Sequence, residues 1–399
     1  MPKKRKEHSL TGRITGQLML KAFKAVKKNR GAAGIDKVSI KMFEANLEEN
    51  LTALMRDLKT GCFQPKPLRR AYIPKGKSKL RPLGIPAVRD RVGQEVLRRL
   101  LSPIFERLFH DASYGFRPDR NCHMAIERVL ELHRQGYKVV IDADITGFFD
   151  NIPHKRIMDA VAAEVADGNI LRLVQKFLTA GVMENGVFKP TNVGTPQGGV
   201  FSPLLANAVL NHLDWRLHDA GYHFVRYADD FVVLCQTRQQ AEEALIFVQQ
   251  IIEELGLQLN LEKTKVTTYG KGYAFLGFQL SASSRKMRLK SMERFKDKIR
   301  ELTCRKHNLD KKAIEKVNRV IRGTANYFAT DFSTSTKLFL HLDAWIRMRI
   351  RCMKFKQKKV TDNYRYRIKV LCKLGLLSLT EFLPGKSKNV MRLLARGNL

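Results

Sequence analysis

Two apolar segments of the chain carry acidic residues where a buried strand would ordinarily carry none. Residues 138–145 read KVVIDADI and residues 224–235 read FVRYADDFVVLC. The β-branched and aromatic residues predict buried strands in both, and the two runs around ADD predict a hairpin with its acids at the turn. Because a buried carboxylate is costly without a cation or a metal beside it, the fold must give these acids partners.

The acids themselves suggest a metal site. Asp142 and Asp144 share one face of their strand, and only one of them need be a ligand, while Asp229 and Asp230 adjoin at the predicted turn. Three carboxylates from two strands would suit Mg²⁺, and two such ions can drive an in-line displacement at phosphorus. The alternative is that each acid is a turn or salt-bridge residue, and Tyr-Ala-Asp-Asp alone does not decide between them.

Two loops favour phosphate chemistry over that alternative. GTPQGG at 194–199 is a glycine-rich loop that precedes a helix beginning near Ser202, and glycines let the backbone approach a ligand. AYIPKGKSKLRPLGIP at 71–86 predicts a short basic hairpin able to clamp a triphosphate. The cations of this hairpin are Lys75, Lys77, Lys79 and Arg81.

The charge of the chain indicates a polyanionic partner. Its 73 Lys and Arg exceed its 38 Asp and Glu by 35, and the residues after 284 contribute 31 of the basic but only 9 of the acidic side chains. A basic protein without a nucleic acid partner is the alternative.

The six cysteines show no C-x-x-C spacing, which predicts reduced thiols rather than a zinc module. With no apolar run of about 20 residues and no apolar signal core at the amino terminus, we expect no membrane association and a location in the bacterial cytoplasm or nucleoid.

In this order, the motifs resemble the group II intron reverse transcriptases over nearly the whole chain. NRGAAGID (29–36) resembles an extra amino-terminal block of that family. The further similar blocks are RPLGIPAVRDRVGQEVL (81–97), YGFRP (114–118), IDADITGFFDNIPH (141–154), VGTPQGGVFSPLLANAVL (193–210), FVRYADDFVVL (224–234), LQLNLEKTKV (257–266) and FLGFQL (275–280).

The resemblance implies a role for each matching residue. The catalytic, metal-binding carboxylates would be Asp144, Asp229 and Asp230, holding two Mg²⁺ ions for which Mn²⁺ can substitute. The nucleotide contacts would be Lys75 and Arg81 on the triphosphate, Gln197 along the incoming nucleotide, Phe149 as the steric gate against a ribose 2′-OH, and Lys263 near the pyrophosphate. The RNA- and DNA-binding residues would be Arg30, Arg347, Arg349, Arg351, Lys354 and Lys356.

The fold implied is α+β, a right-hand polymerase whose fingers and palm precede an α-helical thumb. We expect a basic amino-terminal extension (1–40), reverse transcriptase fingers and palm (41–284), a helical thumb or maturase domain (285–385) and a short basic tail (386–399). The short carboxy-terminal tail and the lack of a Cys/His cluster depart from members that carry an endonuclease.

The function implied is RNA-directed DNA polymerisation. The enzyme would add dNTPs to a DNA primer on an RNA template, and as a maturase it would bind group II intron RNA and assist splicing. Two alternatives remain open: a non-catalytic RNA-binding maturase, and a domesticated reverse transcriptase that acts in DNA repair. The presence of all three acids favours an enzyme over the first alternative.

Overall fold

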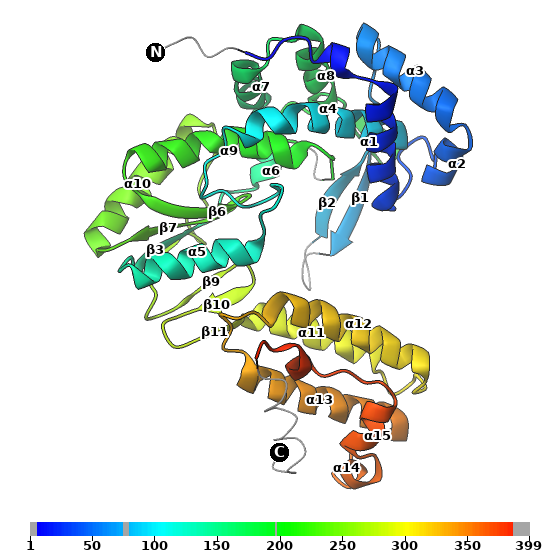
Figure 1. The fold of residues 1–399 in the computed structure, drawn as a ribbon, viewed down its shortest axis with the longest axis vertical. Coiled ribbons are helices and arrows are strands. Elements are labelled where there is room, and N and C mark those ends of the chain that lie inside the picture. Colours follow the sequence, from blue (N-terminus) through cyan, green and yellow to red (C-terminus); the bar gives the residue numbers. More distant parts are fainter. Residues whose placement is uncertain (1–5, 75–79, 196–197, 386–399) are drawn as a thin grey trace. The chain divides into compact units, whose positions relative to one another are not determined.

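The computed structural model describes residues 6–74, 80–195 and 198–385. The chain divides into two compact units, Met1–Val266 and Thr267–Leu399. The first is mixed α and β, and the second combines a small sheet with several helices (Figure 1). The fold class is therefore α+β, as the sequence predicts.

A helical layer opens the first unit. Thr15 accepts a hydrogen bond from the Leu18 amide and begins α1, while Gly61, with φ +74°, ends α3. The α1 helix packs against α3 and α4, and its apolar face belongs to the core. The elements of this layer are η1 (Thr11–Arg13), α1 (Gly16–Lys28), α2 (Ile40–Ala45), α3 (Leu47–Thr60) and α4 (Val88–Glu106).

A four-stranded sheet of order β2-β1-β4-β5 adjoins this layer. Its β1 pairs antiparallel with β2 and parallel with β4, and β4 pairs antiparallel with β5. The β4–β5 turn is Asn185-Gly186, and both residues have positive φ, as a tight two-residue hairpin requires. The strands are β1 (Leu68–Pro74), β2 (Leu80–Ile85), β4 (Val182–Glu184) and β5 (Val187–Lys189).

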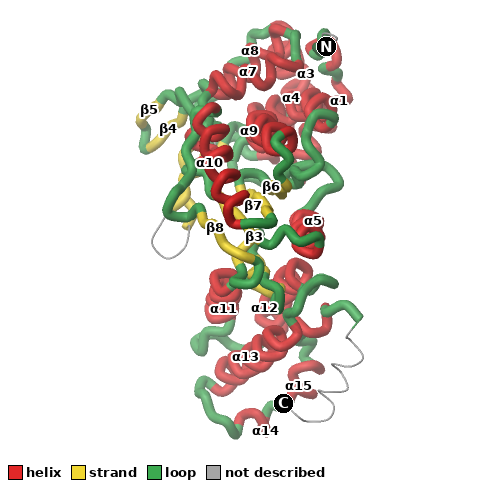
Figure 2. Tube along the Cα trace, turned by 90° about the vertical axis from the view of Figure 1, so that its left-hand side faces the viewer, coloured by secondary structure: helices red, strands yellow, loops and turns green. Residues whose placement is uncertain are grey.

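A second four-stranded sheet, of order β6-β7-β3-β8, carries the acidic residues. The α10 helix packs on β3 and β7, α5 and α9 contact β6, and in Figure 2 the sheet lies between α10 and α5. Its strands are β3 (Val139–Ala143), β6 (His223–Tyr227), β7 (Asp230–Cys235) and β8 (Lys265–Thr268). The other helices of the first unit are α5 (Cys122–Arg134), α6 (Phe148–Asn151), α7 (His154–Glu164), α8 (Gly168–Leu178), α9 (Ser202–Asp219) and α10 (Arg238–Glu254). Of these, α7 packs against α8 and α9, and α8 also contacts α4.

The second unit has a core of its own. Phe278 is fully buried against Phe328 and Phe332, and the buried Asp343 carboxylate accepts hydrogen bonds from the Leu379 and Thr380 amides. Its strands are β9 (Tyr273–Phe275), β10 (Phe278–Leu280) and β11 (Arg285–Met287). Its helices are α11 (Leu289–Leu302), α12 (Lys311–Phe328), α13 (Thr336–Phe355), α14 (Asp362–Arg365), α15 (Ile368–Lys373) and η2 (Leu379–Phe382).

The segment before β8 is mostly not a strand. In LQLNLEKTKV (257–266) the alternation of apolar and polar residues is typical of a strand, but only the last two residues belong to β8. The Asn260 side chain and carbonyl both accept a hydrogen bond from the Lys263 amide, which closes a turn over residues 260–264. This local hydrogen bonding overrides the alternating pattern, and the turn brings Lys263 toward the acids.

Candidate active site

Asp229 and Asp230 lie at the turn of the β6–β7 hairpin, as the sequence predicts. Tyr227 pairs with Asp230, which leaves Ala228 and Asp229 as the two loop residues. Ala228 has φ +58°, a left-handed conformation that turns the chain in two residues. Asp229 is half-buried and Asp230 is exposed, so both lie where a ligand from solvent can reach them.

Asp144 reaches the same end of the sheet from β3. The antiparallel register pairs Ala143 with Phe231, and continuing it by one residue sets Asp144 opposite Asp230. Directly opposed residues in such a pair have Cβ atoms about 4.5–5.5 Å apart. Asp144 and the pair Asp229-Asp230, which are distant in sequence, thus lie at neighbouring ends of two paired strands.

The carboxylates are hard oxygen donors of the kind Mg²⁺ prefers. Among the described residues, no group of three or more His, Cys, Asp or Glu side chains is placed so that it could hold a metal ion by itself. Mg²⁺ does not require one, because it is commonly held by one or two carboxylates and takes waters and substrate phosphates as its other ligands. The open arrangement of Asp144, Asp229 and Asp230 fits that mode of binding.

Lys263 lies directly on the Asp144 carboxylate. Its Nζ is 2.9 Å from Asp144 Oδ2, with 63% of the lysine side chain and 36% of the aspartate side chain exposed. The same turn also holds the Asp144 backbone, since the Asn260 amide donates to the Asp144 carbonyl at 2.7 Å and the Asp144 amide donates to Thr264 Oγ1 at 3.3 Å. The ion pair places a cation beside the acids without burying it.

A buried arginine supports the acidic turn, and the sequence reasoning missed it. Arg226 and Asp214 are both 0% exposed, and two hydrogen bonds of 2.7 and 2.5 Å join the guanidinium to the carboxylate. The same guanidinium donates to Asn207 Oδ1 and to the Ala228 carbonyl within the turn. An arginine inside an otherwise apolar strand was the signal that could have revealed this network.

The YGFRP motif packs against the back of the same turn. The Tyr114 amide donates to the Arg226 carbonyl at 2.8 Å, and Asn207 Nδ2 donates to the Gly115 carbonyl at 2.8 Å. A Cβ at Gly115 would lie 2.3 Å from the Ala228 nitrogen. Only glycine lets the two backbones approach this closely, so the motif serves to position the turn.

The GTPQGG loop is attached at both ends. The Gly194 amide donates to the Ile152 carbonyl and the Thr195 amide to the Phe149 carbonyl, at 2.8 and 2.7 Å. At the other end of the loop, a Cβ at Gly198 would lie 2.7 Å from the carbonyl oxygen of Gly84 in β2, the strand that begins with Leu80 and Arg81. The loop therefore links the Phe149 segment to the basic β1–β2 hairpin.

Arg81 and Phe149 are two further residues predicted to contact the nucleotide. Arg81 is exposed on β2, paired with Ile73 of β1. Phe149 is half-buried, and its ring packs edge-on against Phe148 at 5.3 Å. Lys75 and Gln197 lie outside the described residues.

The predicted RNA-binding residues are placed in two ways. Arg30 is exposed in a loop that Arg69 and Arg91 hold by hydrogen bonds to the Ala33 and Ala32 carbonyls. The arginines of α13 instead contact other residues of the second unit. Burial lowers the pKa of Arg347. Arg349 donates to Thr303 Oγ1, and the buried Arg351 donates to the Tyr366 carbonyl. Lys354 and Lys356 are exposed, and Lys356 also contacts Asn308.

A basic face of α12 was not singled out from the sequence. Its exposed cations recur every three or four residues, which places them along one side of the helix. They are Lys312, Lys316, Arg319 and Arg322. The signal was present in KKAIEKVNRVIRG, where the apolar residues mark the opposite, buried face.

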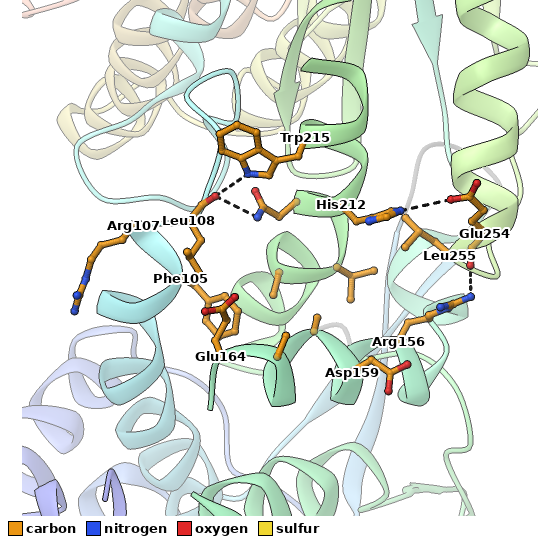
Figure 3. A pocket seen from close by; sticks show the side chains of 15 residues that line it. Phe105, Arg107, Leu108, Arg156, Asp159, Glu164, His212, Trp215, Glu254 and Leu255 are labelled. Carbon is orange, nitrogen blue, oxygen red and sulfur yellow. Dashed lines mark hydrogen bonds and ion pairs between the residues drawn. The ribbon is translucent and has the colours of Figure 1, made fainter. Parts of the chain in front are cut away.

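The first unit also contains a cavity of about 820 Å³ that is separate from the acids. It lies among α4, α7, α9 and the end of α10, and Figure 3 shows hydrogen bonds and ion pairs between the residues that line it. Trp215 Nε1 donates to the Leu108 carbonyl at 2.9 Å, and Arg156 donates to the Glu254 carbonyl. None of the three aspartates lines it, so cavity size does not locate the chemistry here.

Comparison with known proteins agrees with this geometry. Residues 73–280 match the family model described as reverse transcriptase (RNA-dependent DNA polymerase). The chain belongs to the reverse transcriptase family. Residues 292–370 of this reverse transcriptase match a second model, the group II intron maturase-specific domain. The expected polymerase fold with a helical domain after it is thereby confirmed.

Three relatives illustrate the similarity. Protein YkfC of Escherichia coli is 37% identical over 63% of this chain and 77% of its own length. Group II intron-encoded protein LtrA of Lactococcus lactis is 43% identical over 42% of this chain and 28% of its own length. An uncharacterized 91 kDa protein in the cob intron of Schizosaccharomyces pombe is 30% identical over 58% of this chain and 36% of its own length. The match thus covers about a third of the latter two proteins.

Proposed function

We propose that this reverse transcriptase extends a DNA primer on an RNA template, using Asp144, Asp229 and Asp230 as the ligands of two Mg²⁺ ions. The observation that carries the proposal is the register of β3, β6 and β7, which brings the three carboxylates to one end of the sheet. Phosphoryl transfer needs little covalent chemistry from the protein and depends on charge and position. Mn²⁺ is expected to substitute.

The residues of the chain divide the remaining tasks. When bound, the two ions activate the primer hydroxyl and stabilise the leaving oxygen. Arg81 and Lys75 are proposed to hold the triphosphate, and Gln197 to lie along the nucleotide. Phe149 would fill the space of a ribose 2′-OH and favour dNTPs. Lys263, which pairs with Asp144, is proposed to steady the pyrophosphate.

The second unit is proposed to bind RNA. The group II intron maturase-specific match and the charge of residues after 284 support binding of a template–primer duplex and of intron RNA. In this unit the exposed face of α12 offers four cations that can reach phosphates, in addition to Lys354 and Lys356. Arg30, an exposed residue of the first unit, is proposed as a separate RNA contact. Arg347, Arg349 and Arg351 of α13 are also proposed to contact RNA, and the hydrogen bonds from Arg349 to Thr303 and from Arg351 to the Tyr366 carbonyl hold two of these side chains in place.

The domain limits proposed are those predicted from the sequence, with the fingers and palm at 41–284 and the maturase domain at 285–385.

No helix among the described residues is long and apolar enough to cross a membrane. We propose that the protein acts in the bacterial cytoplasm or nucleoid, where its nucleic acid partners are found.

Primer extension on a defined RNA template tests the proposal. Wild type with Mg²⁺ and dNTPs should extend the primer, and Asp229→Ala should not, while both bind the RNA–DNA duplex equally. Asp159→Ala is a matched control, because Asp159 is an exposed aspartate whose partner is Lys155 on the same helix. That variant should keep full activity.

The competing function is a maturase that binds intron RNA without synthesising DNA. A folded wild type that binds RNA but gives no extension with Mg²⁺ or Mn²⁺ would establish that reading instead. A preference for DNA templates over RNA templates would favour a role in DNA repair.

A further inference from the structure

Two short segments beside the acids form one bonded unit, which we call the gate clamp: residues 149–154 and residues 193–195. Thr195 and Gly194 donate their amides to the Phe149 and Ile152 carbonyls, at 2.7 and 2.8 Å. Pro153 and Val193 form an antiparallel bridge between the same segments. The backbone of Phe149 is therefore set by the loop that follows Val193.

The gate clamp leaves no room for adjustment at Gly194. This residue is buried with φ +82°, a conformation that L side chains rarely adopt. A Cβ there would lie 2.6 Å from the Asp150 carbonyl oxygen and 2.9 Å from that of Phe149. The close approach of the two backbones makes any displacement of the loop a displacement of the Phe149 segment as well.

His154 closes the clamp through its side chain. It is the first residue of α7, only 8% exposed, and its Nε2 lies 2.8 Å from the Gly194 carbonyl oxygen. A carbonyl oxygen can only accept, so Nε2 carries the proton and donates it. Burial lowers the pKa of His154, which keeps the imidazole neutral with its proton on Nε2.

The loop also has a fixed far end. The Val200 amide donates to Gln94 Oε1 at 2.7 Å, and Gly198 lies against the backbone of Gly84. With this end tied to α4 and β2, the bond from His154 adds a side-chain restraint to the backbone bonds that hold the Gly194 end.

We propose that His154 is a positioning residue for sugar selection: it holds Gly194, and through Gly194 it fixes the backbone that aims the Phe149 ring. This inference rests on the proposed function, in which Phe149 excludes a ribose 2′-OH. Without the donor, the buried Gly194 carbonyl must move toward another partner, and the Phe149 backbone moves with it. The ring then excludes the 2′-OH less well, whereas the distances among Asp144, Asp229 and Asp230 are unaffected.

Single-nucleotide incorporation on an RNA template tests this role. The quantity to measure is kcat/KM for a dNTP divided by kcat/KM for the matching rNTP. His154→Phe keeps a ring but removes the donor, and it should lower this ratio by about tenfold, equivalent to about 1.4 kcal/mol of discrimination. His154→Gln places an amide donor near the position of Nε2 and should restore most of the ratio. If His154→Phe does not fold, His154→Asn, whose amide falls short of Gly194, takes its place with the same expectation.

Two comparisons make the outcome decisive. Phe149→Ala should lower the ratio further, and adding His154→Phe to it should change the ratio no more, because both act through the same ring. An unchanged ratio in a folded donor-free variant, or an equal loss for dNTP and rNTP, would overturn the role of His154 alone. Absence of extension by wild type would overturn the proposed function and the inference together.

Discussion

Removal of the Asp214 carboxylate should destabilise the first unit strongly, because it strands a buried charge. Arg226 donates two of its hydrogen bonds to Asp214, and neither side chain is exposed to solvent. In Asp214→Ala the guanidinium keeps only Asn207 Oδ1 and the Ala228 carbonyl as acceptors. A guanidinium cannot lose its proton in a protein, so it cannot escape the cost by neutralisation.

The size of the effect follows from this burial. Removing one partner of a buried ion pair costs about 3–5 kcal/mol. Arg216 and Glu254 form a matched pair for comparison, at 2.7 Å but with 37% and 47% of their side chains exposed. Breaking an exposed pair of that kind costs at most about 1 kcal/mol. Arg216→Ala, on the same helix as Asp214, is therefore the control.

Urea unfolding followed by tryptophan fluorescence measures the difference. The chain has two tryptophans, so a Trp345→Phe background leaves Trp215, one residue from Asp214, as the reporter. The double variant Asp214→Leu/Arg226→Met removes both charges and should recover most of the lost stability. A loss in Asp214→Ala no larger than that in Arg216→Ala, or a double variant as unstable as the sum of its parts, would refute the reasoning.

Three further outcomes are expected. Burial raises the pKa of Asp90 from 3.8 to about 6, so the folded state binds the proton more tightly and the stability of the wild type falls as pH rises from about 4 to 6. In urea titrations, Asp90→Asn should therefore be more stable than wild type at pH 7.5, by at most about 3 kcal/mol, and equally stable near pH 3.5. Gly194→Ala should lose about 1–3 kcal/mol through its left-handed φ and its clash with Asp150, together with most of its dNTP incorporation, as thermal melting and primer extension would show. Arg319→Ala and Arg322→Ala should each lower the slope of log affinity against log salt for an RNA–DNA duplex by about 0.8, whereas unchanged slopes would exclude α12 from the interface.

Much of the candidate site follows from local sequence. The β-branched runs on both sides of ADD predict two strands and a turn, and the pleat of each strand follows from its alternation of residues. Once KVVIDA pairs beside that hairpin, Asp144 has only one place to lie, at the strand end opposite Asp230. Strand, turn and cap signals are readable because they depend on residues a few positions apart.

The supports of the site were decided by tertiary structure. Nothing near Arg226 in the sequence indicates that α9 supplies Asp214, or that the first residue of α7 bonds to Gly194 some 40 positions later. For the arginines of α13, the pattern predicts phosphate binding, and only the structure shows that Arg351 also donates to the Tyr366 carbonyl. A guanidinium donates as readily to a phosphate oxygen as to a carbonyl oxygen, and a periodic pattern identifies the faces of a helix without saying what each face contacts. Only packing of distant segments makes that choice.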